Sequence, residues 1–313
     1  MKIHYSFDDY GTIKNPVVTT GSFDGVHLGH KVILNRINTI AKEIDGESVL
    51  ITFHPHPRKI LFPDTLGKEL ELIDSQKEKI DSLKKTGINH LFIIEFTLDF
   101  AKTSSVDFIE NILIKKLHVK KVVIGFNHHF GHNREGDFDK LSELGTKHHF
   151  EFEEIPQQDV ENEAVSSTKI RKALKEGNIQ RANAYLDTEY MIISFLKQGN
   201  KFYQNLSIPT YNVIIDEDTK LIPPVGTYAI SIHSKEGYYS KGLAIINPEL
   251  ATEASFNRNV EIKLFETEPN NIESIEFKIL FHKMIRDNLN HASFSDLQYK
   301  LNADINFTEE LIY

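Results

Sequence analysis

The sequence predicts a two-domain protein: an α/β domain with a mostly parallel sheet, then a small antiparallel six-stranded β-barrel with a C-terminal helix. Strand-like and helix-like segments alternate up to about residue 187, which is typical of a parallel sheet covered by helices. Beyond Glu189 the chain changes to short β-rich runs separated by turns, as in small barrels. At 313 residues the chain is long enough to form two separate cores.

The first domain is predicted from β-rich runs with helical patterns between them. In residues 31–44 apolar side chains recur every three or four positions, which indicates an amphipathic helix. Because the carboxyl ends of parallel strands share one edge of a sheet, we expect ligands to bind there. The expected strands are Val17–Thr20, Ser48–Phe53, Leu91–Phe96, Lys121–Ile124 and Phe150–Ile155. The expected helices are Lys31–Ile44, Asp74–Thr86, Val106–Leu117, Phe138–Leu144, Ser167–Glu176 and Ile179–Leu186.

The second domain is predicted from six short β-rich runs with turn signals between them, such as Pro223-Pro224. A helix over Ser295–Ala303 is expected to close the barrel. We place the domain boundary near residue 187, which divides the chain into residues 1–187 and 188–313. The expected strands are Met191–Leu196, Tyr211–Ile215, Thr227–Ile232, Lys241–Ile246, Val260–Phe265 and Glu276–Phe281.

Composition excludes several classes of protein. The chain has no cysteine, so disulfides, thiolate metal sites and cysteine nucleophiles are excluded. The net charge of -9 argues against a broad nucleic-acid surface. The N-terminal residues lack the apolar core of a signal peptide, and no apolar run approaches the ~20 residues of a membrane-spanning helix. We therefore expect a cytoplasmic enzyme with small-molecule substrates and no nucleic-acid or membrane partner; a weak homo-oligomer is left open.

The most informative motif is GSFDGVHLGH, residues 21–30, which follows the first predicted strand. The N–H groups at a helix start attract anions, and Gly29 allows a ligand to approach the backbone closely. His27 and His30 lie three residues apart, so both imidazoles can reach one polyphosphate. The alternative is a helix cap with two incidental histidines; the position between a strand and a helix favours the phosphate site.

A second motif, SSTKIR at residues 166–171, predicts another helix start that binds phosphate. Ser166 or Ser167 can cap the helix, while Lys169 and Arg171 add cationic donors. Taken alone, the motif is an ordinary N-cap with surface charges. In the same chain as the paired histidines, it favours a second phosphate-binding helix.

Two further motifs follow predicted strands. In GFNHHFG, residues 125–131, the glycines and Asn127 suit a tight polar loop, and Phe126 or Phe130 can stack on a planar ring; a packed turn explains them equally well. The prolines of FHPHPR, residues 53–58, predict a rigid extended exit from a strand. Zinc is disfavoured, because no acidic ligand pattern accompanies these histidines and 15 histidines make chance clusters common. Solvated or loop-bound histidines are the favoured interpretation.

In the second half, Thr210 directly precedes a predicted strand and Asn212 lies near the start of that strand. Glu261 lies within another predicted strand. Threonine and asparagine oxygens can hold magnesium beside a nucleotide, and a nearby carboxylate can act as the base for an alcohol. From these residues alone, a turn and a strand charge that faces water are favoured.

Taken together, these motifs resemble the bacterial bifunctional riboflavin kinase/FMN adenylyltransferase (FAD synthetase) family. GSFDGVHLGH, TFHPHP, GFNHHFGHNREGD and SSTKIR occur in the family's order, and PTYN and NVEIKLFE resemble the PTAN motif and catalytic-glutamate strand of its kinase module. The resemblance implies a Rossmann-like adenylyltransferase domain that joins FMN and ATP to give FAD and pyrophosphate. It also implies a kinase barrel that phosphorylates riboflavin with ATP, and Mg2+ as cofactor.

The resemblance also implies roles for individual residues. His27 and His30 would neutralise charge during transfer, and Glu261 would be the base of the kinase. Thr210 and Asn212 would hold the metal. The residues implied for ATP are Ser22, Phe23, His27, Gly29, His30, Asn127, Ser166, Ser167, Thr168 and Arg171; those for flavin are Phe53, Pro57, Phe126 and Phe130.

The kinase half departs from the family pattern. Tyr203 and Ser207 stand where glycines are expected, and the usual R-x-E pattern is Arg286-Asp287-Asn288. In the first half, Ser22 stands where asparagine is usual. The leading interpretation is a bifunctional FAD-forming enzyme, and the main alternative is an adenylyltransferase with a kinase-inactive, flavin-binding barrel. A non-catalytic flavin-binding protein is a third; a cytidylyl- or pantetheine-type transferase is a fourth, although such enzymes are shorter and lack the β-rich half.

Overall fold

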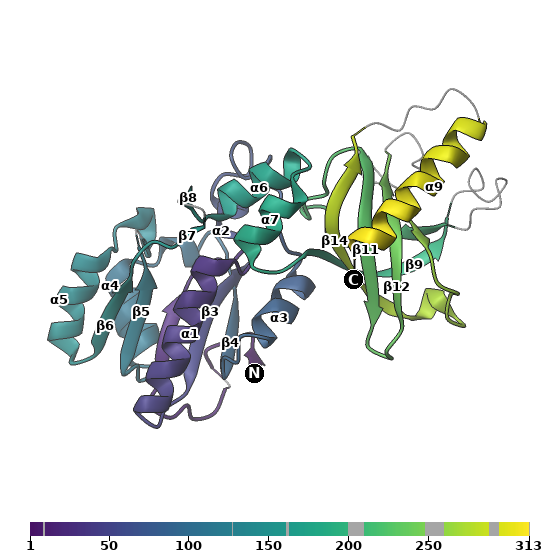
Figure 1. Cartoon of the computed structure of the whole chain (residues 1–313). Coiled ribbons are helices and arrows are strands. Elements are labelled where there is room, and N and C mark those ends of the chain that lie inside the picture. Colours follow the sequence, from purple (N-terminus) through teal and green to yellow (C-terminus); the bar gives the residue numbers. More distant parts are fainter. Residues whose placement is uncertain are drawn as a thin grey trace. The chain divides into compact units, whose positions relative to one another are not determined.

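The computed structural model describes residues 1–8, 10–126, 128–160, 163–199, 210–247, 260–287 and 294–312 (Figure 1). The chain forms two compact units, one of residues 1–70 and 79–166 and the other of residues 71–78 and 167–313. The boundary near residue 187 stays a prediction, since the second unit also takes in the helices just before it. Within the described residues, none of the helices combines the length and apolar character needed to cross a bilayer.

The first unit contains a six-stranded sheet in the order β1-β4-β3-β2-β5-β6. Each neighbouring pair is parallel, which confirms the predicted sheet. The first strand was not predicted, because three residues are too few to show a strand pattern. The strands are β1 Lys2–His4, β2 Val17–Thr20, β3 Ser48–His54, β4 His90–Glu95, β5 Lys121–Gly125 and β6 Glu151–Ile155.

Helices cover both faces of this sheet. Successive strand residues point to opposite faces, so Val17 packs with the apolar stripe of α1 and Val18 packs with the helices of the other face. One face is covered by α1 (Leu28–Glu43) and the C-terminal part of α3 (Gln76–Lys84); the other by α4 (Ser105–Asp107), η2 (Phe108–Ile114) and α5 (Phe138–His148). Smaller elements are α2 (Pro57–Leu61), η1 (Phe100–Lys102), η3 (His132–Arg134) and the hairpin β7 (Asp159–Val160) and β8 (Glu163–Ala164).

One local prediction for this unit is confirmed and another is wrong. The predicted helix over Val106–Leu117 is present as the short α-helix α4, which continues as the π-helix η2 to Ile114. The predicted extended exit after β3 is wrong beyond His56, because Pro57 begins α2. Proline suits a first helical position, and His56 Nδ1 accepts the Arg58 N–H at 3.1 Å as a cap.

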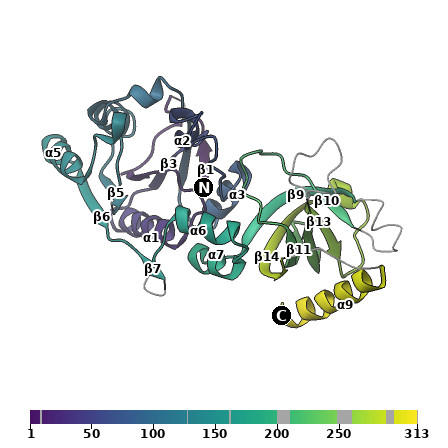
Figure 2. The ribbon, with the colours of Figure 1, turned by 90° about the horizontal axis from the view of Figure 1, so that it is seen from above.

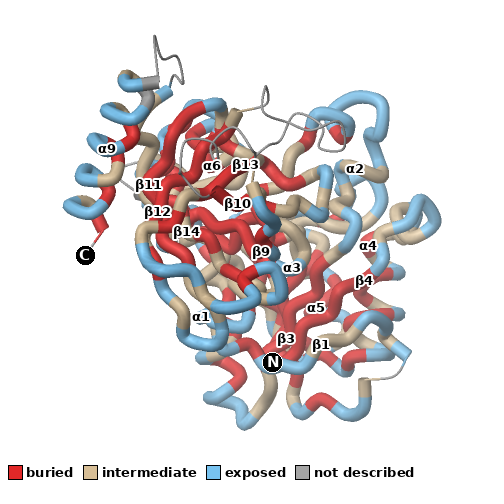
Figure 3. Tube along the Cα trace, turned by 90° about the vertical axis from the view of Figure 1, so that its right-hand side faces the viewer, coloured by how far each residue is buried: buried red, intermediate tan, exposed pale blue. Residues whose placement is uncertain are grey.

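The second unit contains a closed six-stranded antiparallel barrel in the order β10-β13-β12-β11-β14-β9, as predicted (Figure 2). Its strands are β9 Tyr190–Gln198, β10 Tyr211–Val213, β11 Gly226–Ser234, β12 Tyr239–Ile246, β13 Val260–Leu264 and β14 Glu276–Arg286. The other elements are α6 Ser167–Lys175, α7 Ile179–Leu186, η5 Ile272–Ser274 and α9 Phe294–Leu311. The last helix is longer than predicted, and buried and exposed residues alternate along it (Figure 3).

Residues 71–78 pack on the barrel although they lie far from it in the sequence. Leu72 forms a parallel bridge with Lys220, in which Leu72 N–H donates to the Thr219 carbonyl at 2.6 Å. Lys220 Nζ lies 2.6 Å from Glu78 Oε2, and both side chains are 2% exposed. A buried ion pair therefore fastens this segment to the barrel.

Candidate active sites

A cavity of about 400 Å³ lies at the carboxyl ends of the parallel strands in the first unit. The strand order reverses at β2, whose neighbours are β3 and β5, and ligands bind at such switch points in open α/β sheets. Its lining residues come from the ends of β2, β5 and β6 and from the start of α1 and the residues before α6: Thr20, Gly21, Ser22, Phe23, His27, Gly29, His30, Ile33, Gly125, Phe126, His128, Ile155, Pro156, Gln157, Gln158, Ala164, Val165 and Ser166.

The paired histidines form the start of α1. His27 is the N-cap, and its Nδ1 accepts the His30 backbone N–H at 3.4 Å. Because an acceptor nitrogen carries no proton, neutral His27 carries its proton on Nε2. The two rings are stacked with centroids 3.7 Å apart, and Phe23 lies 4.6 Å from His30. The cap therefore fixes both rings in the cavity.

The environment of His30 favours a neutral imidazole. Burial, with smaller contributions from His27 and Lys79, holds the pKa of His30 well below its usual value. Lys79 Nζ also lies 3.4 Å from the carbonyl of Ser22, which is in the loop between β2 and α1. His30 Nδ1 is buried and has no hydrogen-bond partner among the residues that the structure describes. A polar atom left in this state is ready to bind a ligand group.

The cavity brings together seven of the predicted nucleotide- or flavin-binding residues: Ser22, Phe23, His27, Gly29, His30, Phe126 and Ser166. Ser167 and Thr168 begin α6 and belong to the second unit. In that unit Arg171 Nε donates to the Glu71 carbonyl at 2.9 Å. Asn127 lies outside the described residues. Phosphate binding by these residues stays a prediction.

The other residues predicted to bind flavin lie elsewhere in the first unit. Phe53 packs against Phe96 and Phe100, with ring centroids 5.5 and 5.6 Å away. Pro57 begins α2, and Phe130 contacts the core that contains Phe108. Of the described residues, these three are not among those that line the cavity. Flavin binding by them stays a prediction.

Sequence reasoning missed His128, Gln157 and Gln158, which line the cavity. The interpretation of the loop histidines as solvated holds for His129, which is exposed. It is wrong for His128, whose Nε2 is buried without a partner in the described part of the chain. No signal distinguishes two adjacent histidines in a loop, because only the folded backbone decides which ring points inward.

In the second unit, Thr210 and Glu261 meet inside the barrel. Thr210 Oγ1 donates to Glu261 Oε2 at 3.1 Å, and the two residues are each 1% exposed. The prediction from residues alone, a strand charge that faces water, is therefore wrong. Glu261 pairs across strands with Asn212 and Ile245, which places its carboxylate next to the predicted metal ligands.

Gly199 and Asn212 complete this constellation. Gly199 N–H donates to the Thr210 carbonyl at 2.8 Å, and a Cβ at Gly199 would lie 2.3 Å from Thr210 Oγ1. Only glycine fits there. Asn212 Oδ1 is buried with no partner among the described residues, while Nδ2 donates to the Gln198 carbonyl at 3.4 Å. Tyr203 and Ser207 lie outside the described residues.

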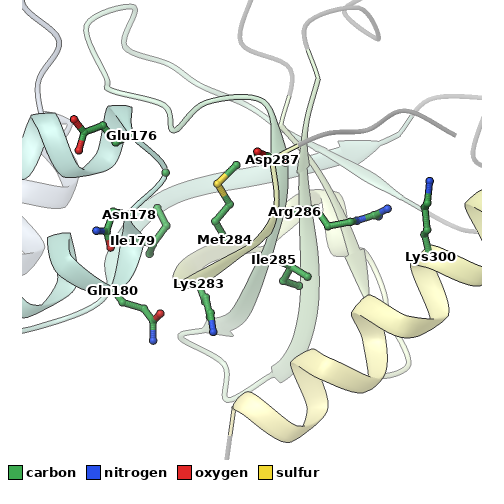
Figure 4. A pocket seen from close by; sticks show the side chains of 11 residues that line it. Glu176, Asn178, Ile179, Gln180, Lys283, Met284, Ile285, Arg286, Asp287 and Lys300 are labelled. Atoms are coloured by element: carbon green, nitrogen blue, oxygen red, sulfur yellow. The ribbon is translucent and has the colours of Figure 1, made fainter.

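Two of the cavities on this unit are larger than a further one of about 100 Å³. One, of about 600 Å³, is lined by Gln198, Thr210 and Tyr211 and by residues 268–274. The other, of about 580 Å³, lies between the α6–α7 connection and the end of β14 (Figure 4). Arg286, from the altered R-x-E pattern, binds Asp304 of α9, and Asn288 lies outside the described residues. Among the described residues, no group of three or more acidic, histidine or cysteine side chains is arranged for a metal.

The fold and the two sites define a class of protein: a Rossmann-like unit with paired histidines at its switch point, followed by a closed barrel with a buried Thr–Glu pair. The family model for FAD synthetase matches residues 11–169, and that for riboflavin kinase matches residues 186–312. The chain belongs to the bifunctional riboflavin kinase/FMN adenylyltransferase family.

Relatives of that name match nearly the whole chain. The relative of Buchnera aphidicola from Schizaphis graminum is 32% identical over 95% of this chain and 94% of its own. The relative of Buchnera aphidicola from Acyrthosiphon pisum is 31% identical over 93% of this chain and 91% of its own. The relative from Listeria monocytogenes is 28% identical over 95% of this chain and 92% of its own. A crystal structure called a macrolide-efflux protein, from Streptococcus pneumoniae, has a TM-score of 0.86 and 25% identity over 98% of both chains. It supports the same fold for the entire chain.

Proposed function

We propose that this chain makes FAD from riboflavin in two steps, each of which uses ATP. The barrel phosphorylates riboflavin to FMN, and the first unit transfers AMP from ATP to FMN and releases pyrophosphate. The match of both family models carries the proposal, and the buried Thr210–Glu261 pair supports the kinase step. We place both steps in the cytoplasm, as fits enzymes of metabolism; a weak homo-oligomer and the absence of a nucleic-acid partner stay predictions.

In the transferase step an oxygen of the FMN phosphate bonds to the α-phosphorus of ATP while the bond from that phosphorus to the bridging oxygen breaks. No protein nucleophile is required, so catalysis depends on alignment and on neutralising charge. His27 and the start of α1 line the cavity that is proposed to receive the phosphates, and a helix start favours anions. Ser166, Ser167, Thr168, Arg171 and Asn127 are proposed to hold phosphates.

Flavin is proposed to bind through aromatic surface at the ends of the strands. Phe126 lines the cavity and is 51% exposed, so its ring is available for stacking. Phe53 at the end of β3, Pro57 at the start of α2 and Phe130 in the loop after β5 are proposed to contact the flavin as well.

In the kinase step the riboflavin hydroxyl attacks the γ-phosphorus of ATP, ADP leaves, and Glu261 accepts the hydroxyl proton. Its carboxylate is held by Thr210 and shielded from water, as suits a general base. The neutral oxygens of Thr210 and Asn212 fit magnesium, since Asn212 Oδ1 is buried and unpartnered among the described residues. When bound, magnesium neutralises charge on the ATP phosphates.

The alternative, a kinase-inactive barrel that binds flavin, rests on Tyr203 and Ser207. The match to the riboflavin kinase model and the full-length bifunctional relatives favour the active barrel. The same matches disfavour a non-catalytic protein and the shorter transferases.

Chromatography of flavin products tests both activities. With riboflavin, ATP and magnesium, the wild type should form FMN and FAD. Glu261→Gln should slow riboflavin phosphorylation about 10²- to 10⁴-fold and leave FAD formation from FMN unchanged, whereas His30→Ala should do the reverse. Wild-type protein that makes FAD from FMN but no FMN from riboflavin would establish the kinase-inactive alternative; failure of both reactions would overturn the proposal.

A further inference from the structure

We propose that His128 is a ligand-binding residue of the adenylyl-transfer site, where its Nε2 carries the ring proton and donates it in a hydrogen bond to a phosphate oxygen of ATP or of FMN. This inference rests on the proposed function. It starts from the geometry of the loop that follows β5, because that loop places the ring of His128 on the wall of the cavity that His27 and His30 also line.

The hydrogen bonds of His128 are incomplete. Its Nε2 is buried and has no partner among the residues that the structure describes. Buried polar atoms in folded proteins nearly always have a partner, and an unsatisfied one lowers stability. The cavity is the place from which a ligand atom can supply the missing partner. An unpaired atom at a ligand cavity is therefore better explained by binding than by packing.

Backbone contacts fix the course of the loop on both sides of His128. His128 N–H donates to the Gly125 carbonyl at 3.1 Å, and Phe130 and Gly136 exchange two backbone hydrogen bonds of 2.9 Å each. Gly131, with φ of 77°, lies so close to Ser105 that a Cβ would be 2.5 Å from its nitrogen. Because the loop backbone is already ordered, less conformational entropy of the loop is lost when a ligand binds.

The charge state of His128 suits an uncharged donor. Burial, with smaller contributions from His129 and Arg134, lowers the pKa of His128 from 6.5 to about 4. The titratable groups that share its cavity are His27 and His30. At neutral pH the ring therefore offers one N–H and no charge. Phosphate oxygens accept such a hydrogen bond, and a nearby phosphate favours the protonated ring, which raises the pKa.

The test compares His128→Phe with His129→Phe, a change at the adjacent exposed histidine. In FAD formation from FMN and ATP, His128→Phe should raise KM for one or both substrates about 10- to 100-fold. Separate KM values identify which substrate provides the phosphate. His128→Gln, which keeps a donor, should lie between wild type and His128→Phe, and His129→Phe should match wild type.

Thermal melting separates binding from a structural role. Since phenylalanine removes the unsatisfied atom and keeps a ring of similar shape, His128→Phe should melt at or above the wild-type temperature. A lower melting temperature with unchanged KM values would overturn the inference and show a packing role.

Proton NMR of the His128 ring, assigned by its absence in His128→Phe, provides a readout that does not need turnover. Its pKa should rise when a non-hydrolysable ATP analogue or FMN is added. A rise without FAD formation would support the inference and overturn the proposed function, whereas FAD formation with an unchanged pKa and unchanged KM would overturn the inference alone.

Discussion

Replacing Lys220 with methionine should destabilise the barrel unit by about 3–5 kcal/mol, because the change leaves a buried carboxylate without its cation. Lys220 Nζ contacts Glu78 Oε2 at 2.6 Å and donates to the carbonyls of Ile73 at 2.6 Å and Met191 at 2.8 Å. Burial lowers the pKa of Lys220, but Glu78 and the neighbouring acidic groups raise it more, so the net direction is upward and the ammonium stays charged.

Glu78 cannot escape to water when its partner is lost. Glu78 Oε1 accepts the Ile193 N–H at 2.9 Å, and Oε2 accepts the Ser75 N–H at 2.7 Å. Methionine nearly preserves the volume of the lysine side chain, so the expected loss comes from the charge and its hydrogen bonds rather than from a cavity. The measured loss of stability therefore reports on the ion pair and its hydrogen bonds, not on packing.

Hydrogen exchange of the Ile193 amide measures the effect, because this amide donates to Glu78 and lies in the barrel. A loss of 3–5 kcal/mol corresponds to exchange about 100- to 4,000-fold faster. Lys235→Met is the matched control, since Lys235 is 75% exposed and lies 3.4 Å from Glu276; it should cost less than about 1 kcal/mol. The double variant Lys220→Met/Glu78→Gln should be about 2 kcal/mol less destabilised than the sum of the single variants. Wild-type exchange in Lys220→Met, or simple additivity, would refute this reasoning.

Two further predictions concern the sites. Gly199→Ala would place a Cβ 2.3 Å from Thr210 Oγ1, so riboflavin phosphorylation should fall about 100-fold while FAD formation from FMN stays constant; an unchanged kinase rate would contradict the close packing. Between pH 6.5 and about 4 the unfolded chain protonates His128 and the folded chain does not, so stability should fall as the pH decreases, by about 3 kcal/mol over that window. Urea unfolding at several pH values measures how stability depends on pH. His128→Phe should reduce this dependence and His129→Phe should not. Equal pH dependence in the wild type and both variants would contradict the role given to His128.

Most of the fold could be predicted from the sequence because its signals are local. The apolar residues of α1 recur at helical spacing, and β2 and β3 are continuous β-rich runs, so their bounds agree closely with prediction. The π-helix η2 could not be predicted, because its apolar residues also fit an α-helix. The strand β1 carries too few residues for a pattern, and its pairing with β4 is non-local.

The sites were predictable only where chemistry depends on spacing along the chain. His27 caps the helix that contains His30 three residues later, so their proximity follows from the local geometry of a helix start. Thr210 and Glu261 are 51 positions apart in the sequence, and a strand charge such as Glu261 is exposed or buried according to the barrel that surrounds it. The residue type of Glu261 therefore suggested a general base from the sequence, whereas its burial could be known only from the fold.

Because residues 71–78 pack on the barrel, no single cut in the sequence separates the two units of this chain. The change in sequence texture near residue 187 and the two family models both separate an N-terminal from a C-terminal segment. Yet Glu78 and the Ile73 carbonyl, which lie within the first match, bind the buried ammonium of Lys220 in the second. A barrel cut from the chain at residue 186 would keep the lysine and lose these partners. Isolating the kinase module therefore removes the same ion pair that Lys220→Met removes, and leaves Lys220 without Glu78 and the Ile73 carbonyl.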